Sequence, residues 1–478
     1  MAKITGDENP VYSDSTILLT TVLESIVNDK NPVVKPFAEF VLTTRYDDIP
    51  GQTIERVKDL ILDLIGVSAA SHNIIASRIG RETCLRMFNG KDEDTLARIL
   101  FDGRTASLAG AAYAGANQID SLDGHDGFSL AKGHAGCGLL PALLCFAESK
   151  PEMTGREFLT AMVIGYEVAC RAGMALHGTV SDYHTSGAWV SLAVAALGVR
   201  LMGGDEHILR QGVGIAEYHG PRSQMMREID NPTMLHDGSG WGSMVGVVSA
   251  ELALSGFEGA PAITIENEDA APYWSDLGVN WLTNDQNIKL FPVCRWAHAP
   301  IQASLDLRRK YRLLPEDIDC IEILAFEEAT RLAKGIPETT GKAQYSISYP
   351  VAAALAFGQV SAREVSGETF NDPVVAELVE RIRVTECSIC NDNFPQDRLG
   401  RTIITKKTGK VLDSGIVRAP GEHTNPVDRN QIIAKFRAFS HPSAGVERSN
   451  AIEQAIFSLD TSGVKLSDLS DSLFPSID

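Results

Sequence analysis

Residues 119–138 concentrate side chains that can exchange protons. This segment reads IDSLDGHDGFSLAKGHAGCG and holds Asp120, Asp123, His125, Asp126, Lys132 and His134 between two apolar runs. An unpaired charge is expensive to bury, so a hydrophobic core does not need such a cluster. Titratable groups that share one walled pocket can have their pKa values pushed apart, which proton transfer requires. The segment by itself is equally consistent with an acid–base site and with a solvated polar loop.

Metal binding is a further alternative for this segment. Its Asp-x-x-Asp-x-His-Asp spacing contains the residue types that bind divalent cations. The spacing matches neither an EF-hand loop nor the helix of a zinc protease, and loops with several Asp residues are common. We therefore predict that the segment holds no metal.

Four further clusters place polar groups beside predicted helices. They span residues 183–187 (YHTSG), 232–242 (PTMLHDGSGWG), 289–298 (KLFPVCRWAH) and 345–349 (YSISY). His184 precedes an Ala-rich helix, where the helix dipole disfavours the charged imidazole and favours a bound anion. The glycine-rich turn around His236 can cradle an oxyanion with backbone N–H groups, but it lacks the Lys-Ser/Thr pair of a phosphate loop. A helix cap and an ordinary turn are the alternatives.

The last two clusters carry groups that suit a carboxylate ligand. Lys289, Arg295 and His298 fall at the predicted boundary between two structural units, where small-molecule sites are common. Lysine and arginine bind carboxylates, and arginine does so in a bidentate manner. The hydroxyl of a tyrosine such as Tyr349 can donate to an enolate. A surface salt-bridge patch and ordinary helix packing are the alternatives.

Composition bounds the class of protein. The 478 residues exceed what one hydrophobic core organises, so we expect two or more structural units. A net charge of −19 argues against a nucleic-acid-binding surface. The eight cysteines are scattered, as expected for reduced thiols. The N-terminus lacks a signal peptide and no stretch is typical of a membrane span, so we expect a cytoplasmic protein that binds neither membranes nor nucleic acid.

Hydrophobic periodicity predicts the elements that position these clusters. Helices are expected at 54–70 with Thr53 as cap, from residue 92 onward, and at 154–176 with Thr154 and Glu157 as a capping box. Small-residue helices are expected at 105–118, 139–148, 187–202 and 242–254. Strands are expected at 318–326, 381–387 and 401–420, the last as a hairpin turning at Thr408 and Gly409.

The predicted fold is mainly α. We expect a large all-helical domain over residues 1–284 and a smaller α+β domain over residues 285–422. Amphipathic helices over residues 423–478 are expected to rejoin the first domain.

In this order along the chain, the clusters resemble the MmgE/PrpD family, which includes 2-methylcitrate dehydratase, cis-aconitate decarboxylase and iminodisuccinate epimerase. The resemblance extends from about residue 37 to the C-terminal helices. Besides the four polar clusters and residues 119–138, YDDIPGQTIERVKDLILDLIGV resembles the opening helix of the family. It implies a cofactor-independent enzyme, commonly a homodimer, with its site between the helical domain and an α+β lid.

The resemblance also implies which side chains form the site. The implied catalytic residues are Asp120, His134, His184, Lys289 and Tyr349. The implied substrate-binding residues are Arg295, His298, His236, His125, Lys132 and Ser346. Two departures from the decarboxylases leave the substrate open. Gly124 stands where those enzymes carry a Thr, and Thr233 or His236 stands where they carry a Lys.

The expected substrate is a small di- or tricarboxylate. Lys289 and Arg295 would neutralise a carboxylate and stabilise the enolate, while His134 or His184 takes the α proton. We predict dehydration of a 2-methylcitrate-like acid, with Tyr349 or the second histidine protonating the departing hydroxyl. Epimerisation and decarboxylation of a polycarboxylate are the alternatives, followed by a non-catalytic family member that binds carboxylates.

Overall fold

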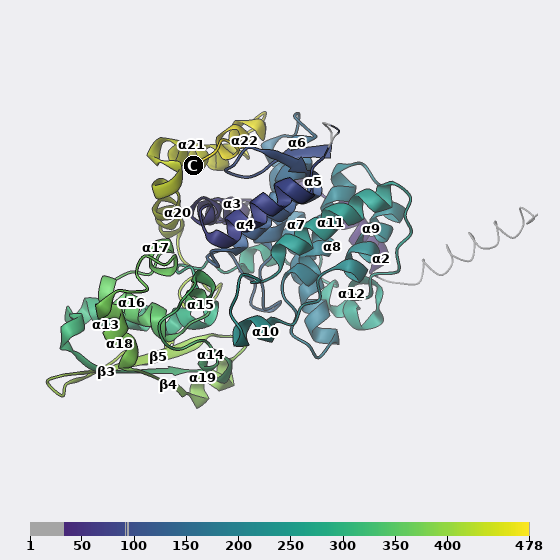
Figure 1. The fold of residues 1–478 in the computed structure, drawn as a ribbon. Helices are drawn as coiled ribbons and strands as arrows, with labels where there is room; N and C mark the ends of the chain where they lie inside the picture. Colours follow the sequence, from purple (N-terminus) through teal and green to yellow (C-terminus); the bar gives the residue numbers. More distant parts are fainter. Residues whose placement is uncertain (1–32, 91, 93–94, 478) are drawn as a thin grey trace, which may run out of the picture.

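Helices dominate the computed structural model, which describes residues 33–90, 92 and 95–477 (Figure 1). The N-terminal residues, in which we expect no signal peptide, lie outside the described part. The prediction of a mainly α protein is confirmed.

The larger part of the molecule, coloured from purple to teal in Figure 1, is a bundle of packed helices. They are α2 (Val34–Thr43), α3 (Gly51–Ser71), α4 (Ile75–Met87), α5 (Leu108–Asp120), α6 (Gly136–Glu148), α7 (Gly155–Thr179), α8 (Gly187–Leu201), α9 (Glu206–His219), α10 (Met225–Asp230), α11 (Ser239–Leu254) and α12 (Ile263–Glu266). Helix α8 lies at the centre, because it packs against α6, α7, α9 and α11 and only its last two residues are not buried.

Helix α7 shows how the sequence sets these elements. The Thr154 hydroxyl accepts a hydrogen bond from the backbone N–H of Glu157, and the Glu157 carboxylate binds back, so the predicted capping box is confirmed. The helix is long and apolar enough to cross a bilayer, yet 94% of its most apolar window is buried inside the protein. Its packing against α3, α6 and α8 accounts for this apolar composition.

The expected helix from residue 92 onward is wrong. Residues 96–98 form strand β1 (Leu96–Arg98), which pairs antiparallel with β2 (Thr105–Ser107). The turn between them contains Asp102 and Gly103, and Gly103 has a φ of +81°. An Asp-Gly pair tolerates this left-handed conformation and favours a hairpin. The larger part is therefore helical without being all-helical.

The predicted cap of the first long helix is also wrong. Helix α3 begins at Gly51, directly after Pro50. Thr53 consequently lies inside the helix and is buried, so it cannot act as the cap.

A smaller sheet forms the second part, drawn in green at the lower left of Figure 1. Its strands are β3 (Ile318–Ala325), β4 (Ile382–Glu386), β5 (Leu399–Lys406), β6 (Val411–Asp413) and β7 (Val417–Arg418). The strand order is β4-β3-β5-β6, with β7 also paired to β5. β3 and β4 are parallel and the other pairs antiparallel. The predicted strands and the hairpin turn at Gly409 are confirmed.

Helices between and before the strands cover this sheet. They are α13 (His298–Tyr311), α14 (Glu327–Thr330), α15 (Thr340–Gln344), α16 (Ser348–Phe357), α17 (Ala362–Val365), α18 (Pro373–Glu380) and α19 (Ser388–Asn393). Short 3-10 turns occur at Tyr46–Asp48, Glu268–Tyr273, Leu282–Asp285, Arg295–Ala297 and Pro315–Asp317. Helices α13 and α16 pack against each other and against the strands.

The chain then returns to the helical part. Helices α20 (Arg429–Ala444), α21 (Val446–Ser458) and α22 (Ser467–Leu473) are yellow in Figure 1, and α20 runs along α3. Lys435 of α20 and Asp63 of α3 form a buried ion pair at 2.6 Å. The domain limits at residues 284 and 422 stay predictions.

Glycines let α8 and α11 approach closely. A Cβ on Gly246 would lie 2.4 Å from the Cβ of Val194, well inside van der Waals contact. A Cβ on Gly242 would lie 2.5 Å from the carbonyl oxygen of Gly187. This close approach brings the first turn of α11 against the start of α8.

We expect Gly246→Ala to lower the free energy of unfolding by about 1–3 kcal/mol, because the added methyl group overpacks the α8–α11 contact. Denaturant titration followed by circular dichroism measures this change. Gly51→Ala is the matched control, since a Cβ at this first residue of α3 meets nothing within 4 Å. An equal loss in both variants would contradict the packing argument.

Candidate active site

Residues 121–135, between α5 and α6, form a buried loop that we call the site loop. Two of its residues have left-handed backbone conformations, with φ of +52° at Asp123 and +54° at Lys132. Such conformations are uncommon outside glycine. Aspartate adopts them more readily than lysine, so the positive φ of Lys132 is the stronger sign of a constrained turn. The loop therefore has a specific shape that its surroundings must stabilise.

Donors from distant elements bind the backbone carbonyls of the site loop. Gln344 donates to the Ser121 oxygen at 3.0 Å, Lys289 to the Asp123 oxygen at 3.2 Å, and Lys435 to the Gly124 oxygen at 2.6 Å. Gly127 and Asn287 exchange two backbone hydrogen bonds. A buried carbonyl without a partner costs about 1–3 kcal/mol, so these donors set the position of the loop.

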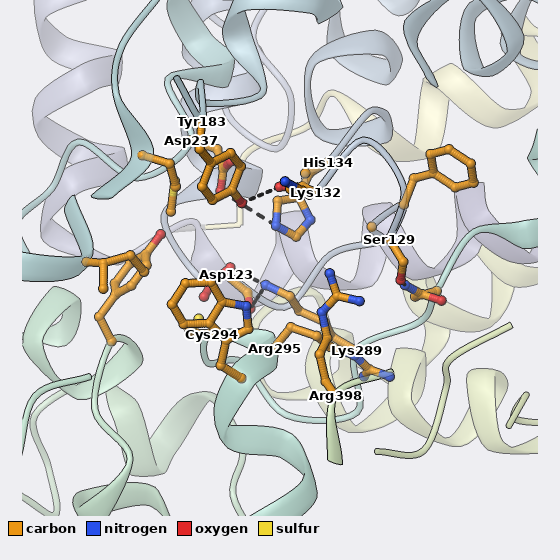
Figure 2. Close-up of a pocket in the computed structure, with 18 residues that line it drawn as sticks. Asp123, Ser129, Lys132, His134, Tyr183, Asp237, Lys289, Cys294, Arg295 and Arg398 are labelled. Atoms are coloured by element: carbon orange, nitrogen blue, oxygen red, sulfur yellow. Dashed lines mark hydrogen bonds and ion pairs between the residues drawn. The ribbon is translucent and has the colours of Figure 1, made fainter. Parts of the chain in front are cut away.

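A pocket with about 580 Å³ of empty space opens beside the site loop (Figure 2). The helical part contributes the loop itself, Tyr183 before α8 and Asp237 before α11. The segment before α13 contributes Lys289 and Arg295, and the segment before β5 contributes Arg398. The pocket therefore lies where the helical part and the sheet-containing part meet, which is a common position for a small-molecule site.

Four cationic side chains line this pocket in a protein whose net charge is −19: Lys132, Lys289, Arg295 and Arg398. Lys289 is 2% exposed and forms a buried ion pair with Asp123. Burial lowers the pKa of Arg398, and the nearby Glu422 carboxylate partly offsets this effect. Clustered cations of this kind favour an anionic ligand.

Two neighbours orient Arg295. Its Nε donates to Glu422 at 2.9 Å, and its Nη1 donates to Nδ1 of His298 at 3.1 Å. Nε2 of His298 lies 3.1 Å from the carbonyl oxygen of Val293, so it must carry the proton. Burial and Arg295 hold the pKa of His298 well below its ordinary value, which keeps it a neutral acceptor. The Nη2 of Arg295 is buried without a hydrogen-bond partner in the described protein, so it is available to a ligand.

His134 has a defined tautomer. Its Nδ1 is hydrogen bonded to the backbone carbonyl of Asp126, which only accepts, so Nδ1 carries the proton. The Nε2 lone pair is therefore the basic position, and Asp237 lies 3.6 Å from it. Burial and the Lys289 charge lower the pKa of His134 to about 4. The resting imidazole is neutral at pH 7 and can accept a proton.

Asp120 and His125 form a second pair behind His134. Nε2 of His125 lies 3.4 Å from Asp120, and the His125 ring meets the His134 ring edge to face at 4.5 Å. Burial and the charge of Asp237 raise the pKa of Asp120 to about 7, while burial and Lys289 lower that of His125 to about 4. A proton on the Asp120 carboxyl can therefore bridge to a neutral His125.

Asp120, His125 and Cys137 also offer three buried ligand atoms within 4.8 Å of one another, a geometry that a metal ion could use. Two contacts compete with that role. The Cys137 thiol donates to the Ser239 hydroxyl at 3.1 Å, and burial raises the pKa of this thiol well above its ordinary value. A metal binds the thiolate, so binding here would have to displace this thiol proton.

Comparison with known proteins identifies the family. The MmgE/PrpD N-terminal domain matches residues 35–273, and the MmgE/PrpD C-terminal domain matches residues 291–461. The chain belongs to the MmgE/PrpD family. It is 23% identical to a cis-aconitate decarboxylase-like protein of Aspergillus oryzae, over 91% of this chain and 97% of that protein. It is also 23% identical to a cis-aconitate decarboxylase of Aspergillus terreus, over 93% of this chain and 96% of the relative.

The structure brings together part of the site that the family resemblance implies. Lys132, His134, Lys289 and Arg295 line the pocket. Asp120, His125 and His298 do not line it but contact residues that bear on it, as described above. His125 thus links Asp120 to His134, and His298 contacts Arg295.

Four implied residues lie outside the pocket. The Tyr349 hydroxyl is bound to Thr369 at 2.7 Å and to the Glu364 carbonyl, and the Ser346 hydroxyl donates to the Ala333 carbonyl. Tyr349 belongs to the first turn of α16 and Ser346 lies two residues before this helix, which packs within the sheet-containing part.

The two remaining histidines face other neighbours. His184 stacks on His177 with ring centroids 6.4 Å apart, and its backbone N–H donates to the His177 ring. His236 contacts the ring of Tyr345 and lines a separate groove beside Thr233 and Lys342. Of His134, His184 and His236, only His134 lines the pocket beside the site loop.

The pocket contains residues that sequence reasoning missed. They are Ser129, Tyr183, Asp237, Tyr345 and Arg398. Ser129, Tyr183, Asp237 and Tyr345 stand within the polar clusters, near the residues that were singled out, so the clusters indicated the correct segments. Asp123, which the sequence also singled out, lines the pocket as well. Arg398 ends the polar stretch NDNFPQDR, whose composition is that of an ordinary loop, so nothing in its local sequence marks it as a pocket residue.

The raised pKa of Asp120 predicts a pH-dependent stability. The folded protein holds a proton on Asp120 up to about pH 7, whereas the unfolded chain releases it near 3.8. The contribution of Asp120 to the free energy of unfolding is therefore complete below pH 3.8, and it is lost as the pH rises through 7. Asp120→Asn mimics the protonated carboxyl and should remove this loss.

Denaturant titrations at several pH values between 4 and 7 test this expectation. The difference in unfolding free energy between Asp120→Asn and the unmodified protein should grow in favour of the variant as the pH rises. Asp319→Asn, at an exposed position of β3, is the control. A difference that is constant with pH would show that Asp120 is ionised throughout.

Proposed function

We propose that this protein is a lyase that acts on a small di- or tricarboxylate through an enolate intermediate. The observation that carries this proposal is the pocket in which four cations surround one neutral histidine with an unprotonated Nε2. The cations suit carboxylates, and the histidine suits proton transfer at carbon.

We assign each pocket side chain a role from its position. Arg295, with its free Nη2, and Arg398 would bind the carboxylates that do not react. Lys289 would stabilise negative charge as it develops on the enolate, because its ammonium group is fixed by Asp123 before substrate arrives. His134 would move the proton at the adjacent carbon through Nε2. The chemistry uses these side chains and calls on no cofactor.

Decarboxylation is the reaction that we favour, because both relatives compared with this chain are named as cis-aconitate decarboxylases or proteins like them. Loss of carbon dioxide leaves the electron pair on the neighbouring carbon, where the enolate needs the same cations. One proton must then reach that carbon. Because His134 is neutral at rest, its Nε2 would first take this proton from solvent, once the substrate carboxylates offset the charge of Lys289, and would then deliver it to the carbon. The substitution of Thr233 or His236 for the lysine of the decarboxylases leaves the particular acid undecided.

Dehydration of a 2-methylcitrate-like acid is the second candidate, since the pocket offers further hydrogen-bond donors. Tyr183 and Tyr345 line it in place of the expected Tyr349, and burial keeps the pKa of both phenols above the ordinary value. The Tyr183 hydroxyl already donates to the Lys132 carbonyl, so Tyr345 is the phenol that would donate to a departing hydroxyl group. Epimerisation would need a second base on the opposite face of the substrate, and Asp123 is the carboxylate available there.

A panel of cis-aconitate, citrate, 2-methylcitrate and amino-dicarboxylates in deuterated water, read by NMR, tests the proposal. The protein is first dialysed against a chelator. Released carbon dioxide supports decarboxylation, a new vinyl signal without carbon dioxide supports dehydration, and deuterium at carbon with neither product supports epimerisation. No reaction with any acid would favour the non-catalytic alternative over the lyase.

With a reactive acid in hand, Lys289→Met should lower kcat/KM by about 100- to 1,000-fold, because the enolate loses its charge partner. Steady-state kinetics measure this loss, and circular dichroism checks the fold, since Asp123 is left buried without its cation. Lys465→Met is the matched control, because Lys465 pairs with Glu152 on the surface. A variant of Lys289 with unchanged kcat/KM would contradict the proposed role.

We further propose that two copies associate through α4, α5 and α11. These adjacent helices expose Ile79, Met87 and Trp241, and Trp241 packs on Tyr113 of α5 with ring centroids 5.2 Å apart. A large exposed apolar face of this kind marks an association surface. Light scattering should find a dimer that Trp241→Glu weakens, whereas Leu314→Glu, at an exposed apolar residue of the other part, should not.

A further inference from the structure

Asp237 is held at the start of helix α8. Its carboxylate Oδ1 accepts a hydrogen bond from the Ser186 hydroxyl at 2.7 Å and faces the Ser186 N–H at 3.4 Å, and its carbonyl accepts from the Gly187 N–H at 3.0 Å. The residues on either side, His236 and Gly238, have φ of +50° and +66°. These two left-handed residues, together with the Ser186 hydrogen bond, fix the position of the Asp237 carboxylate.

The environment of this carboxylate favours its ionised form. Burial acts to raise the pKa of Asp237, but the charge of His134 when that ring is protonated, the Ser186 hydroxyl and Lys289 act in the opposite direction, and the pKa lies below its ordinary value. The N-terminus of α8 adds the positive end of a helix dipole. Asp237 is therefore an anion inside a pocket whose charged side chains are mainly cations.

The second oxygen of Asp237 faces the basic position of His134. Oδ2 lies 3.6 Å from Nε2, while Nδ1 of the same ring is committed to the Asp126 carbonyl. Ser186 ties the two residues together, because its hydroxyl also accepts from the His134 N–H at 2.8 Å. A carboxylate oxygen and an imidazole lone pair are both acceptors, so a proton between them is needed for a favourable contact.

We propose that Asp237 is a positioning residue that acts through His134, and that the pair holds the proton which the reaction moves. This inference rests on the proposed function. When Nε2 takes a proton from the substrate carbon, the electron pair of that C–H bond stays on the substrate as the enolate. The imidazolium then donates from Nε2 to Asp237 and from Nδ1 to the Asp126 carbonyl. Return of the proton to a carbon or a departing oxygen restores the neutral ring.

Two nearby groups, Lys289 and His125, oppose the effect of Asp237 on the pKa of His134 in the resting protein. Burial and Lys289 lower the pKa of His134, and His125 acts in the same direction. Asp237 and Asp123 raise it. Tyr183 and Lys132 also face the pocket, from the segment before α8 and from the site loop. A substrate carboxylate bound to Lys289 would cancel the main opposing charge, which leaves Asp237 to stabilise the imidazolium during the reaction.

Asp237→Asn tests the pair, since asparagine keeps the Ser186 contact and removes the charge. NMR of protein with nitrogen-15-labelled histidine, with the His134 signals assigned from His134→Gln, follows the ring without substrate. We expect the titration of His134 to move to lower pH by about one unit or more, as an opposite charge is lost. Its neutral Nδ1–H tautomer should persist. Asp237→Glu should restore part of the shift.

Kinetics add a readout that a purely structural role would not change. In Asp237→Asn the acid limb of kcat/KM should move to lower pH with a plateau lowered by about tenfold or more, because a weaker base remains. Asp182→Asn, an exposed carboxylate on the same segment as Tyr183, should change neither property. If the His134 titration stays at the same pH in Asp237→Asn, the proposed role of Asp237 is wrong. If the unmodified protein turns over no polycarboxylate while the titration still moves, the proposed function fails and the pair stands.

Discussion

The site depends on one constraint, which is that the backbone of a buried loop must find hydrogen-bond donors. The site loop carries Asp123 and His134 of the pocket, yet most of its residues are buried. Its carbonyls are satisfied by Lys435 of α20, by Lys289 and by Gln344 of α15. These donors come from the C-terminal helices and from the sheet-containing part. The loop takes its shape only when all parts of the chain have folded around it.

The same donors explain how charges are tolerated in this interior. Lys289 binds both the backbone and the carboxylate of Asp123, and Lys435 binds both Asp63 and the loop. Breaking a buried pair leaves a charge without compensation, at a cost of about 3–5 kcal/mol. The cations are therefore fixed before a ligand arrives. Such preorganisation is what stabilisation of a developing negative charge requires.

Local patterns predicted much of this protein. The capping box of Thr154 and Glu157, the hairpin turn at Gly409 and the long apolar helices follow from neighbouring residues, whose preferences act within a few positions. The order of polar clusters identified the family. The Asp-Gly turn after Leu96 was a signal of the same local kind, and weighing it would have predicted strand β1.

Residue types and their spacing determined which short segments hold the chemistry, that the fold is mainly α, and which family the chain belongs to. Tertiary structure decided which side chain of each segment lines the pocket. Asp123 rather than Asp120 lines the pocket, because Asp120 ends α5 and faces Ser239, while a left-handed turn directs Asp123 to Lys289. Tyr345 takes the place of Tyr349 for a similar reason, since Tyr349 faces Thr369. Periodicity describes one element at a time, whereas these choices depend on contacts between segments that lie far apart in the chain.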